Sequence, residues 1–98
     1  MYKYESHVCT IVKAFYIAPL ETGASNCNRD GYTLSAAKYL EYSRIISSYL
    51  DSMAYGFITP QECLESCMMI YQRSKETIPP LIQQDFERIT NEKAGETK

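Results

Sequence analysis

Hydrophobic positions recur every three or four residues along most of this chain, which is the spacing that places side chains on one face of an α-helix. The clearest stretch predicts a helix over about residues 34–55, with Thr33 or Ser35 as its cap. A second stretch predicts a helix over about residues 60–75. The predicted core-facing stripe of the first helix is Tyr39, Tyr42, Ile46, Tyr49, Leu50 and Met53. The predicted stripe of the second helix is Cys63, Leu64, Cys67, Met68, Ile70 and Tyr71.

A sharp turn between these two helices is indicated by the residues that separate them. Gly56 can adopt the left-handed conformation that ends a helix. The segment Thr59-Pro60-Gln61-Glu62 then has the form of a capping box, with Pro60 at the first helical position. The two helices are therefore expected to fold back on each other.

The first segment, about residues 6–17, also favours a helix. Val8, Ile11, Val12 and Phe15 share one predicted face, although a strand stays open as an alternative because the segment is rich in β-formers. Residues 19–33 concentrate Gly, Asn, Asp and Ser, and we expect one long loop there. Pro79-Pro80 predicts a break, followed by a short helix over about residues 81–91 and a frayed tail at residues 92–98.

These elements predict an all-α fold, a small single-domain bundle of three main helices plus a short C-terminal one, spanning residues 1–98. The length of 98 residues allows one hydrophobic core. A hydrophobic content of 45% with 22% charged residues is typical of globular proteins and argues against a disordered chain.

Charge and targeting signals narrow the setting of the protein. The net charge of −2 provides no broad cationic field, so nucleic acid is an unfavoured partner. The apolar stretch near the start is interrupted by charged residues and no window is long enough to span a bilayer, so neither a signal peptide nor a membrane contact is expected. We expect a cytoplasmic protein with four free thiols and no cofactor.

Metal sites are weighed from two patterns. His7, Cys9, Cys63 and Cys67 form the zinc alternative, since thiols one helical turn apart face the same way. No Cys-x-x-Cys knuckle accompanies them, and reduced cysteines in an apolar stripe more often pack in the core. The segment from Asn26 resembles the start of an EF-hand loop, but Ala37 stands where the bidentate carboxylate is required.

Catalytic motifs are missing from the sequence. His7 is the only histidine, and Cys27 is the one cysteine expected in a loop, yet nothing in the sequence brings the two together as base and nucleophile. We therefore expect no enzymatic activity.

Tyrosine is the unusual component of this composition, with nine tyrosines against three phenylalanines and no tryptophan. Tyrosine combines a large apolar ring with a polar tip and is common at interfaces. The sequence thus favours a protein that binds another protein, as an inhibitor, an immunity or antitoxin-like protein or a regulatory adaptor. The predicted contact residues are Asn28, Arg29, Asp30, Tyr32, Asp51, Tyr55 and Phe57.

Three alternatives stay open beside this hypothesis. One is the zinc-binding helical module, and another is a nucleic-acid-binding helical hairpin. A homo-oligomer is the third, because Leu40, Ile45 and Met69 lie off the main apolar stripes.

Overall fold

The computed structural model describes residues 4–96, with side chains through residue 93, and every regular element in that part of the chain is a helix. This confirms the predicted all-α class, and the helical interpretation of the first segment is correct. The elements in chain order are α1 (Glu5–Val12), the π-helical η1 (Lys13–Ile17), α2 (Ala18–Arg29), α3 (Thr33–Ala54) and α4 (Pro60–Glu96).

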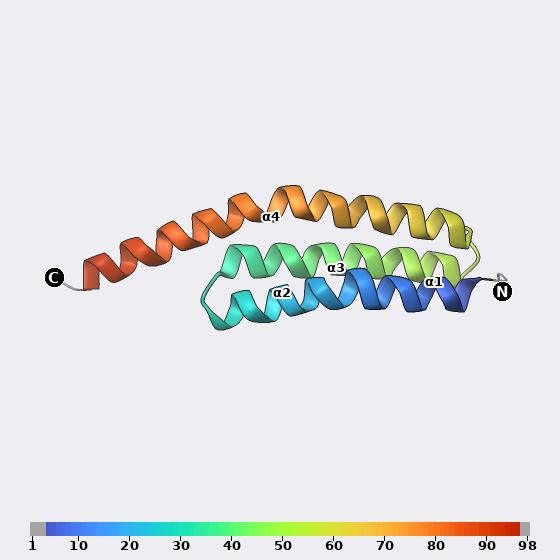
Figure 1. Ribbon diagram of the computed structural model, residues 1–98, viewed down its shortest axis with the longest axis horizontal. Helices are drawn as coiled ribbons and strands as arrows, with labels where there is room; N and C mark the ends of the chain where they lie inside the picture. The colour runs from blue at the N-terminus through green and yellow to red at the C-terminus, as the bar shows by residue number, and fades with distance from the viewer. Residues whose placement is uncertain (1–3, 97–98) are drawn as a thin grey trace.

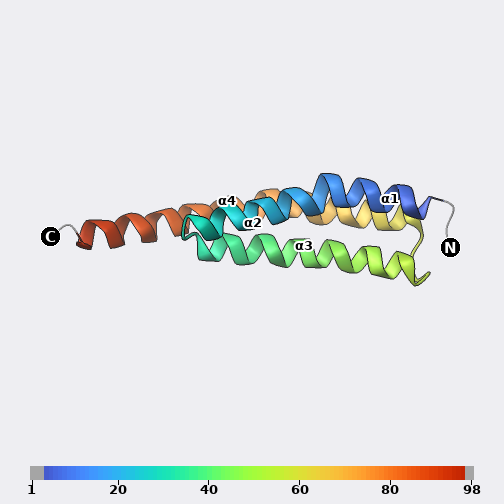
Figure 2. The same ribbon diagram turned by 90° about the horizontal axis from the view of Figure 1, so that it is seen from below.

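Three helical rods lie side by side (Figures 1 and 2). The first rod, residues 5–29, is made of α1, η1 and α2 joined end to end. The second rod is α3, which runs back along the first, and the third is α4, which runs parallel to the first. The C-terminal end of α4 extends past the α2–α3 turn, so the molecule is elongated, with extents of 63 × 20 × 17 Å.

The core lies along the axis shared by the three rods. Its members come from every rod at helical spacing, and the stripes predicted for α3 and for the first half of α4 are confirmed except at Met68, which is 51% exposed. The buried apolar cluster consists of Val8, Val12, Leu20, Tyr42, Ile46, Leu50, Met53, Cys63, Cys67, Ile70 and Ile78.

The π-helical turn η1 changes the face that the first rod presents. Pro19 cannot donate to the carbonyl of Phe15, and its ring would clash with that carbonyl in a regular α-helix. The wider turn, in which the Ala18 amide bonds to the Lys13 carbonyl, relieves this conflict. As a consequence Phe15, predicted to face the core, is 65% exposed.

The long loop predicted at residues 19–33 is wrong, because α2 occupies residues 18–29 and leaves a short α2–α3 turn. Burial of Leu20 and Ala24 against the other rods outweighs the weak helix propensity of this segment. Gly23 is not a turn residue. A Cβ on it would lie 2.7 Å from atoms of the Tyr39 ring, so glycine is required for the close approach of α2 to α3.

The predicted break at Pro79-Pro80 is also wrong, since α4 continues through both prolines to Glu96. The two prolines lie on the exposed side of the helix, where the carbonyls that they leave without amide partners can bond to water. Figure 1 shows α4 arched rather than broken, as expected of proline inside a helix. The helix thus ends beyond the predicted residue 91, the fraying of residues 92–98 stays a prediction, and residues 97–98 lie outside the described part.

Candidate functional site

The residues predicted to contact a partner fall into two groups at opposite ends of the molecule. Asn28 and Arg29 end α2, and Asp30 and Tyr32 follow in the α2–α3 turn. Asp51, Tyr55 and Phe57 lie at or beside the α3–α4 turn. The 22 residues of α3 separate the two groups by about 33 Å. The structure therefore does not unite them in one contact.

The two groups also differ in character. In the α2–α3 group three polar residues are exposed and Tyr32 is half-buried, and Arg29 pairs with Asp30 at 3.5 Å. In the other group Tyr55 and Phe57 are 77% and 80% exposed, and their ring centroids lie 6.3 Å apart. The second group therefore offers the larger exposed aromatic area to a partner.

The four residues of the zinc alternative do not form a ligand set. Among the described residues, no group of three or more His, Cys, Asp or Glu side chains is placed to hold a metal ion. Cys63 and Cys67 are fully buried and point to the carbonyls of Tyr49 and Ile46 at 3.5 and 3.9 Å. Burial raises the pKa of Cys67 to about 12, which keeps its thiol protonated at neutral pH.

His7 and Cys27, the pair considered as base and nucleophile, are also far apart in the structure. His7 lies in α1 and Cys27 near the end of α2, about 30 Å apart along the same rod. They cannot act together as base and nucleophile. Burial, followed by the nearby Asp85 and Asp30, also raises the pKa of the Cys27 thiol.

A largely apolar groove lies between α1 and the start of α4. We call it the α1–α4 groove. Its volume is about 440 Å³. Its lining residues are Tyr4, His7, Val8, Ile11, Thr59, Pro60, Gln61 and Leu64.

Two exposed apolar side chains follow residues that line this groove. Phe15 comes four residues after Ile11, inside the π-helical turn η1, and Met68 comes one turn after Leu64 on α4. Phe15 is 65% and Met68 is 51% exposed. We call the lining of the groove together with these two exposed side chains the groove strip.

Tyr16 on the first rod and Tyr71 on α4 form a tilted aromatic pair. The ring centroids of Tyr16 and Tyr71 lie 4.9 Å apart, with the rings tilted by 42°. The ammonium group of Lys75 lies 4.9 Å from the centroid of the Tyr71 ring, in a cation–π contact. These two contacts restrain the Tyr71 ring, which also lines a second hollow.

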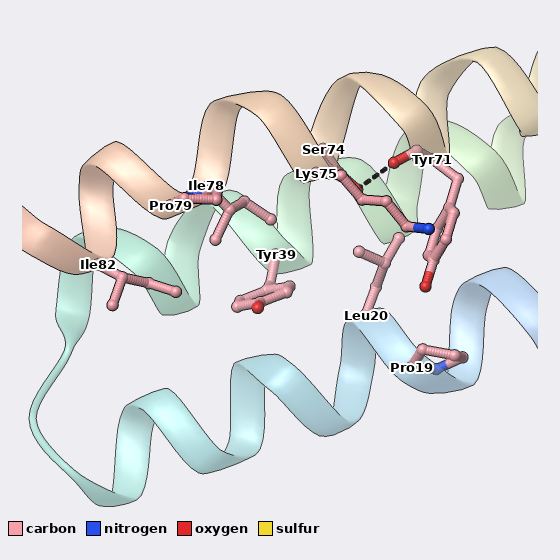
Figure 3. A pocket seen from close by; sticks show the side chains of 9 residues that line it. All are labelled: Pro19, Leu20, Tyr39, Tyr71, Ser74, Lys75, Ile78, Pro79 and Ile82. Carbon is pink, nitrogen blue, oxygen red and sulfur yellow. Dashed lines mark hydrogen bonds between the residues drawn. The ribbon is translucent and has the colours of Figure 1, made fainter.

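That second hollow, which we call the α2–α4 cavity, opens where the first rod moves away from α4 (Figure 3). Its volume is about 280 Å³. Tyr39 projects from α3 into the gap between α2 and α4. The lining residues are Pro19, Leu20, Tyr39, Tyr71, Ser74, Lys75, Ile78, Pro79 and Ile82.

A buried polar cluster closes the end of the bundle beyond this cavity. The Asp85 side chain is 0% exposed, and its Oδ2 accepts hydrogen bonds from the Ser35 amide at 2.8 Å and the Ser35 hydroxyl at 2.7 Å. Oδ1 accepts from the Leu34 amide at 3.3 Å and pairs with Arg88 at 3.3 Å. Arg88 also donates to the Gly31 carbonyl at 2.8 Å.

This cluster caps α3 from another helix. Thr33 and Ser35, the predicted caps, do not serve, because α3 begins at Thr33 and Ser35 is a donor in its first turn. Burial alone would raise the pKa of Asp85, but the hydrogen bonds from Ser35, Arg88 and Leu34 outweigh burial and hold the pKa below its usual value. Asp85 therefore stays charged at neutral pH and acts as a structural anchor.

Sequence reasoning missed the groove, the cavity and the Asp85 cluster. A signal for α2 was present, since Leu20, Ala24 and Cys27 follow helical spacing. If residues 18–29 are recognised as a helix, the first rod becomes continuous and is expected to run antiparallel to α3 and therefore parallel to α4. The groove lies between these two parallel rods. No signal in the sequence points to Asp85 as a cap, because Leu34 and Ser35, whose amides it accepts, lie 51 and 50 residues away in the chain.

Comparison of this chain with family models, with curated proteins and with solved structures finds no match.

Proposed function

We propose that this chain has no catalytic activity of its own and acts by binding another protein, as an inhibitor, an immunity or antitoxin-like protein or a regulatory adaptor. The exposed apolar strip along the α1–α4 groove is the observation that carries the proposal. Single exposed apolar residues are ordinary on a protein surface, but an apolar groove with further exposed apolar side chains on the same two rods is typical of a contact surface.

The strip has the composition of a helix-binding surface. Phe15 supplies a large aromatic anchor, and aromatic anchors often carry much of the binding energy at an interface. Met68 adds a flexible thioether that adapts to the shape of a partner. We infer that the partner contributes an amphipathic helix, which lies along the groove and buries apolar side chains against Ile11 and Leu64.

The architecture favours this occupant. The first rod and α4 run in parallel, and the α1–α4 groove lies between them. A helix laid on this groove would convert the three-rod arrangement into a four-helix bundle, in which the strip becomes core.

The proposed setting is the cytoplasm. All four cysteines are free thiols, which fits a reducing compartment. Separately, none of the described helices is long and apolar enough to cross a membrane.

A matched pair of variants tests the proposal. The double variant Phe15→Ser with Met68→Gln removes exposed apolar area from the groove strip. Tyr55→Ser with Phe57→Ser removes comparable area from the α3–α4 turn. Both tagged variants and the unchanged protein are used for quantitative affinity purification from the source cells, after thermal unfolding has verified that each is folded.

The expected result is a partner that the groove variant loses at least tenfold and the turn variant retains. Crosslinking of that partner to a photoreactive residue at position 15 is expected to join a helical segment of it to the strip. Loss in the turn variant alone contradicts the groove and favours the aromatic pair at the turn. If a second copy of this chain is the only protein recovered, or if no protein is enriched, the proposed function is wrong.

A further inference from the structure

The α2–α4 cavity results from rigid groups that hold two rods apart. Among the described residues, no Cα atom of α2 lies within 8 Å of a Cα atom of α4. The Tyr39 ring stands in the gap, as Figure 3 shows, and Gly23 lets α2 approach that ring from the other side. A side chain at position 23 would displace the ring. The opening is therefore built into the packing of α2 on α3.

Apolar groups form most of the cavity wall. Leu20 and Pro19 come from α2, and Ile78, Pro79 and Ile82 come from α4. Neither proline carries an amide hydrogen, so these parts of the wall offer no backbone donor at those positions. A volume of 280 Å³ equals about nine water molecules at liquid density, which suits a ligand of about ten non-hydrogen atoms. The body of such a ligand must be largely apolar.

One charged side chain lines the cavity, and it is a cation. Lys75 lies over the Tyr71 ring, and that ring also contacts Tyr16. Among the described residues, no carboxylate forms an ion pair with the Lys75 ammonium within 4.0 Å, and no lining residue is acidic. The charge at the rim is thus available for an anion.

Tyrosine hydroxyls add hydrogen-bond donors. Tyr39 and Tyr71 both line the cavity. Burial raises the pKa of Tyr39, and the nearby Cys27 and Tyr71 raise it further, so its hydroxyl stays protonated at neutral pH. Such a hydroxyl can donate to a carboxylate oxygen.

We propose that the α2–α4 cavity binds a small monocarboxylic acid, with the apolar body of the acid between α2 and α4 and its carboxylate at Lys75. This site is distinct from the proposed partner contact, because the cavity and the α1–α4 groove share no lining residue. A neutral molecule of the same shape would fill the cavity without using the charge, and an amine would be repelled by it.

Octanoate, octan-1-ol and octylammonium are probes that share one apolar body and differ in charge. Each is titrated into the full-length protein labelled with ¹⁵N, and amide shifts are followed by NMR. Octanoate is expected to shift amides around Leu20, Tyr39 and Ile78 in a saturable manner. We expect it to bind about two- to fivefold more tightly than octan-1-ol, the range of an exposed ion pair, and octylammonium to bind more weakly than either.

Two charge variants sharpen the test. Lys75→Gln should reduce octanoate affinity to that of octan-1-ol and leave octan-1-ol binding unchanged. Lys13→Gln removes the same charge from an exposed position on the first rod outside the cavity and should have no effect on either probe. Lys75 is exposed, so its replacement is not expected to prevent folding.

Three results would overturn the proposal. They are absence of saturable shifts around the cavity with octanoate, equal affinity for octanoate and octan-1-ol, and tighter binding of octylammonium. The groove variant Phe15→Ser with Met68→Gln should bind octanoate as the unchanged protein does. Failure of the cavity and failure of the groove are therefore distinguishable.

Discussion

The two ends of the bundle hold their helix termini by opposite means. At the α3–α4 end, the Glu62 amide donates to the Thr59 hydroxyl oxygen and the Thr59 amide donates to the Glu62 carboxylate, both at 3.1 Å. At the α2–α3 end, the first amides of α3 donate to Asp85 of α4. One end is capped by its own neighbours in the chain and is exposed, and the other is capped across the bundle and is buried.

This difference separates local from tertiary stabilisation. A capping box forms whenever the four residues of its own turn are helical, so it adds to helix stability wherever that helix packs. The Asp85 cluster forms only if α4 has docked along α3 as far as its second half. The stability of the α2–α3 end therefore depends on the docking of α4 beyond the two prolines. The stability of the capping box at the α3–α4 end does not depend on it.

The largest expected effect comes from replacing the buried carboxylate. Asp85→Ala leaves the Leu34 and Ser35 amides and the Ser35 hydroxyl without their acceptor in a dry site. We expect the free energy of unfolding to fall by about 2–4 kcal/mol, as measured by urea denaturation. Asp85→Asn keeps the shape and one acceptor oxygen, and should fall between Asp85→Ala and the unchanged protein.

The control for this prediction is Asp30→Ala, which removes an exposed carboxylate at the same end. Its effect should stay within about 0.5 kcal/mol. If Asp85→Ala costs no more than Asp30→Ala, the buried cap does not stabilise the α2–α3 end.

The same contrast explains how much of the molecule could be predicted from its sequence. The helix class, the bounds of α3 and the start of α4 at its capping box follow from hydrophobic spacing and neighbouring residues, and they are confirmed. The α2 helix was missed because Gly23 and its polar neighbours resemble a loop, and only the Tyr39 ring explains the glycine. The Asp85 cluster, the groove and the cavity each depend on residues far apart in the chain.

Acid should reduce the stabilising contribution of the Asp85 cap at the α2–α3 end. Because the pKa of Asp85 is held below its usual value in the folded protein, its contribution is fully present above the usual value and is lost as the pH falls through the folded pKa. The difference in unfolding free energy between the unchanged protein and Asp85→Asn should therefore be constant from pH 7 to about pH 5 and shrink below about pH 4. Urea titrations of both proteins at these pH values measure it. A difference that stays constant down to pH 3 would contradict the charged cap.

Two glycines provide a comparison in which the ends should behave alike. Gly31 and Gly56 both have φ of +82°, a conformation that alanine adopts only with strain. An added Cβ at Gly31 would meet Ile89 at an ordinary contact distance of 3.7 Å, and at Gly56 it would meet nothing within 4 Å. Gly31→Ala and Gly56→Ala should each lower the unfolding free energy by about 1 kcal/mol in the same urea assay. A much larger loss at Gly31 would mean that the α2–α3 turn, and not only its cap, is tightly constrained.

The smallest effect is expected at the local cap, and it decides whether the two ends are independent. Thr59→Ala removes one exposed hydrogen bond from the capping box and should cost about 0.5–1 kcal/mol in urea denaturation. Thr59 and Asp85 lie about 39 Å apart along α4 and share no partner, so the loss in Thr59→Ala combined with Asp85→Ala should equal the sum of the single losses within about 0.5 kcal/mol. A combined loss well below that sum would mean that the far half of α4 is already undocked when Asp85 is replaced and that the near end loosens with it. The two ends would then be energetically coupled through α4, and the stabilising effect of the capping box at Thr59 would depend on whether the far half of α4 is docked.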